Sequence, residues 1–397
     1  MVQSDLQASD PIRGAMRGTN QTRVRAHNER LVLSILRQDG PLAKAEIARL
    51  TGLSAQTVSV IMRALEQDGM LLREAPRRGR VGQPSVPMRL NPDAAFFHGI
   101  AIGRSWIEHV LVDMTGAVRA SDRQTYDWPD FDVVLDRVAR SIDALEEVLN
   151  PEQRARVEGL GVATPARIWH LADEVTVPRD KLLAWQNRNF AAELTERCRY
   201  RVQGINDATA PCAAELVFGT HCSERDAFLH VFIGYYVGGG LVIDNHLYTG
   251  PTGRAGAIGT LPIAQADGST RPLYDLASLY RLGQFIVASG KDLEPLLKLP
   301  LEWSSVEDEI EAWLDQVVPA LAHAAVTAVS LVDVQTIMID GYLPETVRAR
   351  IVREVARRIE ETDFAGRDRP EIREGTVGPV ARAMGAASLP LAARFLV

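Results

Sequence analysis

The sequence predicts an α/β protein in which a helical module with a basic hairpin precedes a larger body of strands and helices. Three observations support this class. Two short amphipathic segments within residues 43–65 are joined at a glycine. A basic, glycine-rich segment then separates two short apolar runs within residues 69–90. From residue 97 onward, strand-like and helix-like segments alternate, which is typical of mixed sheets covered by helices.

Length and composition indicate a globular protein of 397 residues with two or three domains. The cysteines Cys198, Cys212 and Cys222 have no CxxC spacing, which suits a reducing compartment and argues against a disulfide framework. The N-terminus lacks an apolar signal core, and we expect no apolar run of the roughly 20 residues that span a bilayer. A cytoplasmic location is therefore expected.

The charge is unevenly distributed along the chain. Residues 1–90 contain 14 Lys and Arg against 8 Asp and Glu, whereas the remainder contains 30 against 43, and the whole chain has a net charge of −7. A basic module on an acidic body is expected when one end meets a polyanion. Chance variation in surface charge is the alternative.

The first ninety residues are predicted in order as an arm, three helices and a hairpin. Residues 1–26 are expected to form a flexible arm, with four arginines between Arg13 and Arg25. Asn28 is predicted to cap a first helix over residues 29–38, and Asp39-Gly40-Pro41 ends it. The apolar residues of the second helix are Ala43, Ile47 and Leu50.

A tight turn follows, because Gly52 can adopt the left-handed conformation that ends a helix and Ser54 is a good N-cap for the next one. In this third helix Val58, Ile61 and Leu65 form one apolar stripe. The other side carries short polar groups and a cation, which reach base edges and phosphates in a major groove. The candidate DNA contacts here are Ser54, Gln56, Thr57, Ser59 and Arg63. The alternative is a helical hairpin with a solvated face.

Residues 69–74 and 86–90 are predicted to pair as a β-hairpin, called a wing. Its glycine-rich tip carries the candidate DNA contacts Arg77, Arg78, Arg80 and Gln83. A disordered basic linker is the alternative. Helices and hairpin together predict a winged helix-turn-helix domain over residues 27–90, whose partner is double-stranded DNA.

The body is predicted to begin at the junction Asn91-Pro92-Asp93-Ala94. Predicted strands cover residues 97–103, 106–113, 157–165, 201–205, 227–235, 239–243 and 336–339. Predicted helices cover residues 131–149 and 347–361, and Asp244-Asn245 is a predicted hairpin turn.

Several motifs resemble the ROK family, which joins sugar kinases and sugar-responsive repressors on a two-lobed, actin-like ATPase (ribonuclease H-like) fold. They are GQPSVPMRLNP, HGIAIGRS, GLGVATPARI, NDATAPCAAELVFG, VGGGLVIDNHLYTGPTGRAGAIG and GPVARAMGAASLPL. The resemblance implies one lobe over residues 91–209, with a C-terminal helix at about 378–397 packing back on it, and a second lobe over 210–377. The N-terminal module indicates the repressor branch, hence a homodimer or dimer of dimers, a small-molecule effector and a role in carbohydrate metabolism.

Two departures from the family's kinases imply that kinase activity is absent and that no cofactor is bound. The first phosphate-binding turn has Ala101 where the kinases have an acidic residue, followed by Gly103-Arg104-Ser105 in place of Gly-Gly-Thr. The second phosphate loop is Gly234-Tyr235-Tyr236-Val237-Gly238, in which two tyrosines replace small residues. Phosphoryl transfer needs its phosphate cradle, metal and base together.

The family's sugar site is partly retained. Asp207, after Asn206, matches the catalytic base and can still contact a ligand hydroxyl; a turn or cap role is the alternative. Ala257 replaces the sugar-binding glutamate. Thr260 replaces a histidine that binds sugar and zinc in relatives, and the cysteines of that zinc site are missing, so we expect no metal there. The candidate effector-binding residues are Asn206, Asp207, Thr164, Asn187, Thr260 and Tyr274.

Other features have structural interpretations. Trp185 is expected in the core, Gly238-Gly239-Gly240 is expected to be a turn where backbones crowd, and His221 and His230 lack metal-ligand spacing. Two alternative functions remain: a sugar kinase with an added DNA module, and a ligand-independent DNA-binding protein whose body only dimerises.

Overall fold

The structure is a computed structural model that describes residues 21–76, 85–165, 168, 179–220, 227–298, 301–364, 366 and 368–397. The chain divides into two compact units. The N-terminal unit comprises Met1–Asn91 with Phe395–Val397, and the body comprises Pro92–Arg394. The division falls between Asn91 and Pro92.

The N-terminal unit has three helices and a two-stranded ribbon: α2 (Gln21–Gln38), α3 (Lys44–Thr51), α4 (Ala55–Gln67), β1 (Leu71–Arg73) and β2 (Met88–Leu90). The strands are antiparallel, with Leu71 opposite Leu90. Val32, Ile47, Val58 and Met62 are fully buried between the helices. This is the expected winged helix-turn-helix.

Two expectations for the first helices are wrong. Helix α2 begins at Gln21, so Asn28 lies inside it instead of capping it, and residues 21–26 of the expected arm are helical. No glycine or proline interrupts this segment, and the ion pair of Arg25 with Glu29 (2.8 Å) supports it at a spacing of four residues. In α3, Ile47 is buried but Leu50 remains 43% exposed.

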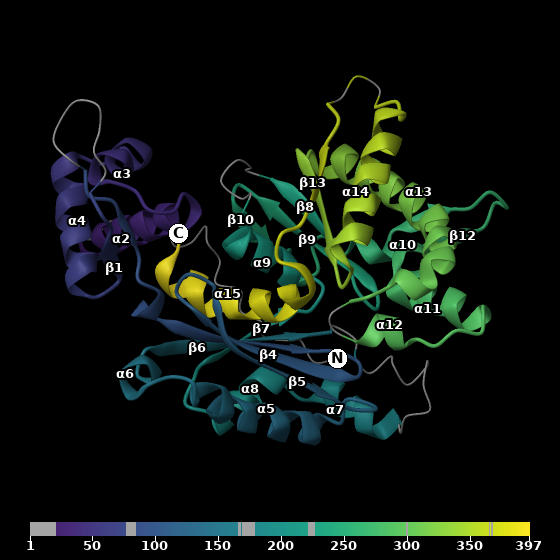
Figure 1. The fold of residues 1–397 in the computed structure, drawn as a ribbon, viewed down its shortest axis with the longest axis horizontal. Helices are drawn as coiled ribbons and strands as arrows, with labels where there is room; N and C mark the ends of the chain where they lie inside the picture. The colour runs from purple at the N-terminus through teal and green to yellow at the C-terminus, as the bar shows by residue number, and fades with distance from the viewer. Residues whose placement is uncertain are drawn as a thin grey trace. The chain divides into compact units, whose positions relative to one another are not determined.

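The first sheet of the body has the strand order β5-β4-β3-β6-β7. The strands are β3 (Phe96–Ile102), β4 (Trp106–Asp113), β5 (Val118–Thr125), β6 (Val157–Thr164) and β7 (Val202–Asn206). The first three form an antiparallel meander, and β6 and β7 continue the sheet in parallel. Helices α5 (Phe131–Glu146) and α8 (Phe190–Arg197) lie on one face and α15 (Ala381–Phe395) on the other (Figure 1).

Helix α15 lies unusually close to the first sheet. A Cβ atom at Gly161 would lie less than 3.0 Å from the backbone of Ala386, and one at Gly99 would collide with Ala383 and Ala387. Glycines on the strands facing alanines on the helix therefore allow backbone-to-backbone packing. The C-terminal helix thus packs back on the sheet formed early in the body.

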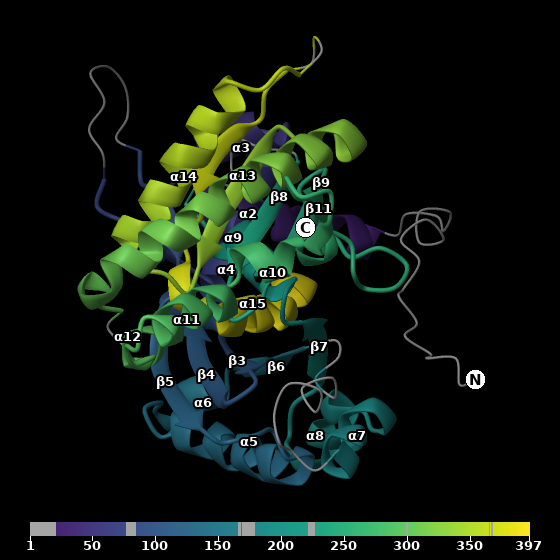
Figure 2. The same cartoon turned by 90° about the vertical axis from the view of Figure 1, so that its right-hand side faces the viewer.

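The second sheet repeats this plan with the order β10-β9-β8-β13-β14. The strands are β8 (Phe228–Ile233), β9 (Val237–Ile243), β10 (His246–Tyr248), β13 (Thr336–Gly341) and β14 (Glu371–Glu374). Helix α9 (Ala210–Phe218) packs on one face, and α13 (Glu307–Val332) and α14 (Glu345–Glu360) pack on the other (Figure 2). Two matching five-stranded sheets, each starting with a meander, define the two-lobed actin-like architecture.

Helix α13 has to be compared with the expectation that the chain has no segment able to span a membrane. The stretch Ser304–Val332 is long and apolar enough to do so by length and composition alone. Its residues Trp313, Val317 and Leu321 are buried in the core beside the second sheet. Core packing therefore accounts for its apolar character.

The predicted strands of the body are present, with ends that differ by at most about two residues, and the strand over residues 106–113 has the predicted bounds. Asp244 and Asn245 form the expected turn between β9 and β10, both with positive φ. The Gly238-Gly239-Gly240 segment lies within β9 instead of a turn, but it is crowded as expected: Cβ atoms there would clash with Ala208, Gly256 and Cys212.

Candidate DNA interface and ligand site

The turn between α3 and α4 forms as its sequence predicts. Gly52 has φ of 67°, in the left-handed region, and ends α3. The Ser54 hydroxyl accepts a hydrogen bond from the Thr57 backbone N–H (3.1 Å) and caps α4. These two local features fix where the second helix starts.

One side of α4 is buried and the other is open. Val58, Ile61, Met62 and Leu65 pack into the core of the N-terminal unit. Gln56, Val60, Arg63 and Gln67 are exposed and follow the helical spacing i, i+4, i+7, i+11. These four residues are called the exposed α4 face below.

The predicted DNA contacts divide between this face and its flank. Gln56 and Arg63 belong to the exposed α4 face, and Ser54 is exposed at its start. Thr57 and Ser59 are half-buried beside it. The Thr57 hydroxyl is hydrogen-bonded to that of Ser54 (2.8 Å), and Lys44 Nζ donates to Ser59 Oγ (3.4 Å).

Val60 is a member of the exposed α4 face that the sequence reasoning missed. It is 56% exposed, between Gln56 and Arg63. The residues predicted to contact DNA on this side of the helix are all polar. Its position four residues after Gln56 and three before Arg63 puts it on the same side of the helix, and this spacing could have identified it. An apolar side chain there can contact a thymine methyl group.

The ribbon β1–β2 is the base of the predicted wing. The wing contacts proposed from the sequence, Arg77, Arg78, Arg80 and Gln83, lie outside the described residues.

In the body, three of the predicted effector-binding residues lie together at the carboxyl ends of adjacent parallel strands. Thr164 ends β6 and is in register with Asn206, which ends β7. The Asp207 backbone N–H donates to the Thr164 carbonyl (3.0 Å). Ligands bind preferentially at such strand ends in open α/β sheets.

The loop of residues 234–238 lies beside this turn. A Cβ atom at Gly238 would be 2.6 Å from that of Ala208, the residue after Asp207. The rings of Tyr235 and Tyr236 pack edge to face, with centroids 4.9 Å apart, and Tyr236 also contacts Tyr274 (5.7 Å). The 234–238 loop therefore carries part of an aromatic cluster.

Arg382, at the start of α15, connects the loop with Asp207. Its Nε is 4.0 Å from Asp207 Oδ2, and its guanidinium lies against Gly234, where a Cβ atom would collide with it. Burial raises the pKa of Asp207, and the positive charge of Arg382 partly offsets this effect. We call Thr164, Asn206, Asp207, the 234–238 loop and Arg382 the Asp207 site.

Two further contacts involve the turn Gly103-Arg104-Ser105. Arg104 donates a hydrogen bond to the Tyr235 hydroxyl, so this turn and the 234–238 loop are joined side chain to side chain. Glu108 on β4 lies directly opposite Ala101 on β3, and burial raises its pKa. The half-buried Arg123 approaches the buried Glu108 (3.7 Å), so an ion pair lies beside Ala101.

The remaining predicted effector residues lie partly outside this constellation. Tyr274, 37% exposed, is on α10 (Leu273–Ala277), and Thr260 ends a short 3-10 helix next to it. Asn187 is exposed at the end of α7 (Arg179–Asn187). Among the described residues, no contact joins it to Asp207. Trp185 is 8% exposed and stacks on Phe190, which confirms that it is a core residue.

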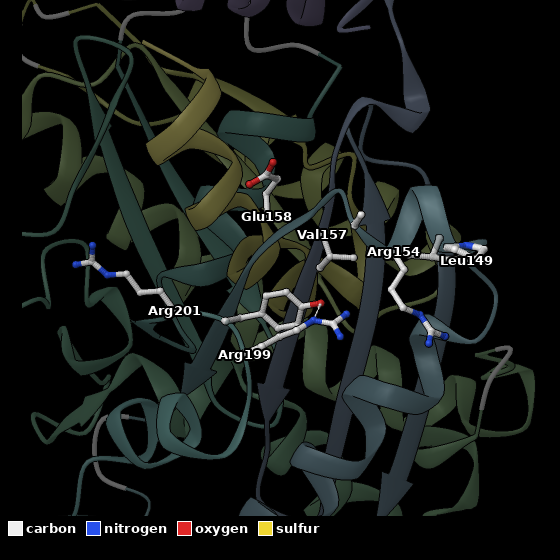
Figure 3. A pocket seen from close by; sticks show the side chains of 9 residues that line it. Leu149, Arg154, Val157, Glu158, Arg199 and Arg201 are labelled. Carbon is white, nitrogen blue, oxygen red and sulfur yellow. Dashed lines mark hydrogen bonds between the residues drawn. The ribbon is translucent and has the colours of Figure 1, made fainter. Parts of the chain in front are cut away.

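A separate pocket of about 740 Å³ opens on the first lobe, and Arg154, Arg199 and Arg201 line it (Figure 3). None of the predicted effector residues lines it. Arg199 and Tyr200 both bind the buried Glu146 beneath. The positive charge of Arg199 therefore balances an internal carboxylate.

The geometry defines a class of protein: a winged helix-turn-helix joined to an actin-like body. Comparison with known proteins agrees. Residues 97–278 match the ROK family, and residues 25–71 match winged helix-turn-helix DNA-binding domains. The chain therefore carries a ROK family domain behind a winged helix-turn-helix DNA-binding module.

Three similar proteins illustrate this relationship. The xylose repressor of Bacillus subtilis is 25% identical over 62% of each chain. A solved ROK family transcriptional regulator, a homologue of the E. coli MLC protein, is 18% identical with a TM-score of 0.64, covering 94% of this chain and 97% of that one. A ROK family glucokinase from Streptomyces griseus is 19% identical with a TM-score of 0.56, covering 74% of this chain and 99% of that one.

Proposed function

We propose that this protein is a cytoplasmic transcriptional repressor that binds an operator through its winged helix-turn-helix and responds to a small molecule bound at the Asp207 site. The observation that carries the proposal is the exposed α4 face, which stands opposite a fully buried stripe on the same helix. Relatives named as a xylose repressor and a transcriptional regulator support it.

The exposed α4 face enters the major groove. From Gln56 to Arg63 the helix rises roughly 10 Å, at about 1.5 Å per residue, which matches about three base pairs. Gln56 reads an adenine edge, Val60 a thymine methyl, and Arg63 a guanine or a phosphate. The arginines of the wing, Arg77, Arg78 and Arg80, contact phosphates or the minor groove.

Two copies of the chain bind one pseudo-palindromic operator as a homodimer, alone or as half of a dimer of dimers. Each α4 then occupies one of two major grooves about 34–36 Å apart. A ligand weakens operator binding only if it binds more tightly to an arrangement of the body in which the spacing between the two α4 helices is different.

The effector is recognised by few carboxylates and several aromatic rings. Asp207, Asn206 and Thr164 offer polar groups, Tyr274 offers an exposed ring, and Thr260 lies beside it. A sugar or sugar derivative suits this mixture, and D-xylose is the first probe because of the named relative. Asn187 has a role only if the ligand extends toward α7.

The body does not transfer phosphate in this proposal. Arg104 and Tyr235 occupy the space between the two former phosphate loops, and Arg382 lies against Gly234 in the second loop. A nucleotide would have to displace these side chains. The kinase alternative predicts ATP turnover with a hexose or pentose, abolished by Asp207→Asn.

Selection of bound duplexes from a random pool by the purified full chain tests the DNA-binding function. The expected product is an inverted repeat whose half-sites are one helical turn apart. Enrichment of no sequence over the starting pool would refute the proposal.

The effector is tested separately by titrating D-xylose, other pentoses, hexoses and aryl glycosides onto the operator complex. At least one should release DNA from the wild-type protein and act more weakly on Asp207→Asn. If none changes DNA affinity or the melting temperature, the effector part is wrong and the body serves only for assembly.

A further inference from the structure

Three buried polar residues meet on the α9 face of the second sheet, away from the Asp207 site. They are Glu215 on α9, His230 on β8 and Asp340 on β13, and each offers a ligand atom within 4.8 Å of the other two. All three residues are 0% exposed. None has a role in the function proposed above.

The topology of the sheet explains how they meet. Strands β8 and β13 are parallel neighbours, with His230 opposite Met338 and Phe232 opposite Asp340. His230 and Asp340 are therefore diagonal neighbours on one face of the sheet. Helix α9 packs on this face through Cys212 against Phe228 and Met338, and it carries Glu215 onto the pair.

Hydrogen bonds hold both carboxylates in place. Glu215 accepts from the backbone N–H and the hydroxyl of Thr376, each at 2.8 Å. Asp340 accepts from the backbone N–H groups of Gly341 and Gly378, each at 2.8 Å. Both carboxylates thus bind the turn of residues 376–378, and such outer contacts orient the ligands of metal sites.

The imidazole of His230 shows that the cluster is chemically incomplete. Among the residues that the structure describes, neither ring nitrogen has a hydrogen-bond partner, although both are buried. An unsatisfied buried polar group costs about 1–3 kcal/mol and needs an explanation. Burial also lowers the pKa of His230, with partial offset from Glu215 and Asp340, which favours the neutral imidazole that ligates metals.

Electrostatics point to a cation between the three groups. Two fully buried carboxylates this close repel each other when both are ionised. Arg348 approaches Asp340 (3.4 Å) but also binds Glu374 (3.0 Å), so its charge is shared. A divalent ion would offset the repulsion and bind the free imidazole.

We propose that Glu215, His230 and Asp340 form a binding site for a first-row divalent transition metal, with Zn²⁺ as the reference ion. One nitrogen and two carboxylate oxygens suit such ions better than Mg²⁺ or Ca²⁺, which prefer all-oxygen shells. Ligand atoms around tetrahedral zinc lie about 3.3 Å apart, so the side chains need to close by at most about 1.5 Å.

This site is distinct from the zinc site of the family's kinases, whose histidine position is Thr260 here. The metal would link α9, β8, β13 and the 376–378 turn that leads into α15. The linear spacing of His230 gave no indication of it, because its partners lie 15 residues before and 110 residues after it in the sequence.

The test uses the untagged full chain, dialysed against a chelator, loaded with Zn²⁺ and freed of excess metal by gel filtration. We expect about one zinc ion per chain in the wild type and a melting temperature above that of the metal-free protein. His230→Phe, which keeps a buried ring, should lose at least about nine tenths of the zinc. His246→Gln, which removes an exposed histidine of the same sheet, should retain it.

Absence of zinc from the wild type, or equal retention by His230→Phe, would overturn the site. If His230→Phe does not fold, Co²⁺ absorption of the wild type decides. Intense ligand-field bands of a four- or five-coordinate ion support the site, and a spectrum of aqueous Co²⁺ refutes it.

Discussion

Val60 provides a sharp test of the exposed α4 face, because its role on DNA differs from its role in folding. The substitution Val60→Ala removes two methyl groups from a side chain that already points into solvent. Alanine is also the best helix former, so α4 should not be weakened. We therefore expect unchanged stability and weaker operator binding.

The expected loss of operator-binding free energy follows from the exposed fraction of the Val60 side chain. Burial of the two methyl groups that the substitution removes is worth about 1.6 kcal/mol, at about 0.8 kcal/mol each, and 56% of Val60 is still open to be buried by DNA. The product is about 0.9 kcal/mol per module, or roughly 5-fold in affinity at about 1.4 kcal/mol per factor of ten. A dimer with both modules bound should show up to twice this free energy.

The assay is fluorescence anisotropy of the selected operator at fixed salt, repeated with deoxyuridine replacing one thymine at a time. Loss of the thymine methyl at the contacted position should weaken the wild type but not Val60→Ala. Val148→Ala in the body is the matched control, because Val148 is 57% exposed and should not affect DNA binding.

Equal operator affinity of Val60→Ala and the wild type would refute the assignment of this face to the groove. So would a uniform loss at every thymine, because that result would indicate a general weakening of the complex.

Three other predictions concern charge, pH and packing. Arg63→Ala should lower the slope of log K against log salt by about one per module, whereas Arg353→Ala in the body should not. The free energy of unfolding should fall below about pH 6.5, because burial lowers the pKa values of His98 and His109 and only the unfolded chain gains those protons. Gly161→Ala should destabilise the body by about 1–3 kcal/mol, because a Cβ atom there collides with Ala386.

Each of these predictions has a clear contrary result. An unchanged salt slope would remove Arg63 from the interface. His109→Phe should reduce the loss of unfolding free energy at acid pH. An unchanged loss in this variant would show that other groups cause it. Gly204→Ala is the packing control, since its Cβ atom would meet Ala191 at an ordinary 3.8 Å; equal melting temperatures for the two glycine variants would contradict the close packing of α15.

Local features of the N-terminal unit were predictable from the sequence. Gly52 and Ser54 act within a few residues of their own positions, so the turn and the start of α4 follow from backbone preference and capping. The continuation of α2 through Asn28 was not predictable in this way, because a capping residue can also lie inside a helix.

The candidate ligand site was only partly predictable. Motif position identified Asn206 and Asp207, and the structure places them beside Thr164. Arg382 was missed because it comes from α15, 175 residues after Asp207, and only the packing of that helix on the first sheet brings it near. The cluster around His230 was missed for the same reason, because Glu215 comes from α9 and Asp340 from β13, both far from His230 in the sequence.

The most direct test of the central claim is a titration of the selected operator and a scrambled duplex with the wild-type protein and a Gln56→Ala/Arg63→Ala double variant, across a range of salt concentrations. We expect the wild type to prefer the operator by at least about a thousandfold, and the variant to lose most of this preference while keeping its melting temperature. Equal binding of both duplexes by the wild type, or full preference in the variant, would contradict the central claim.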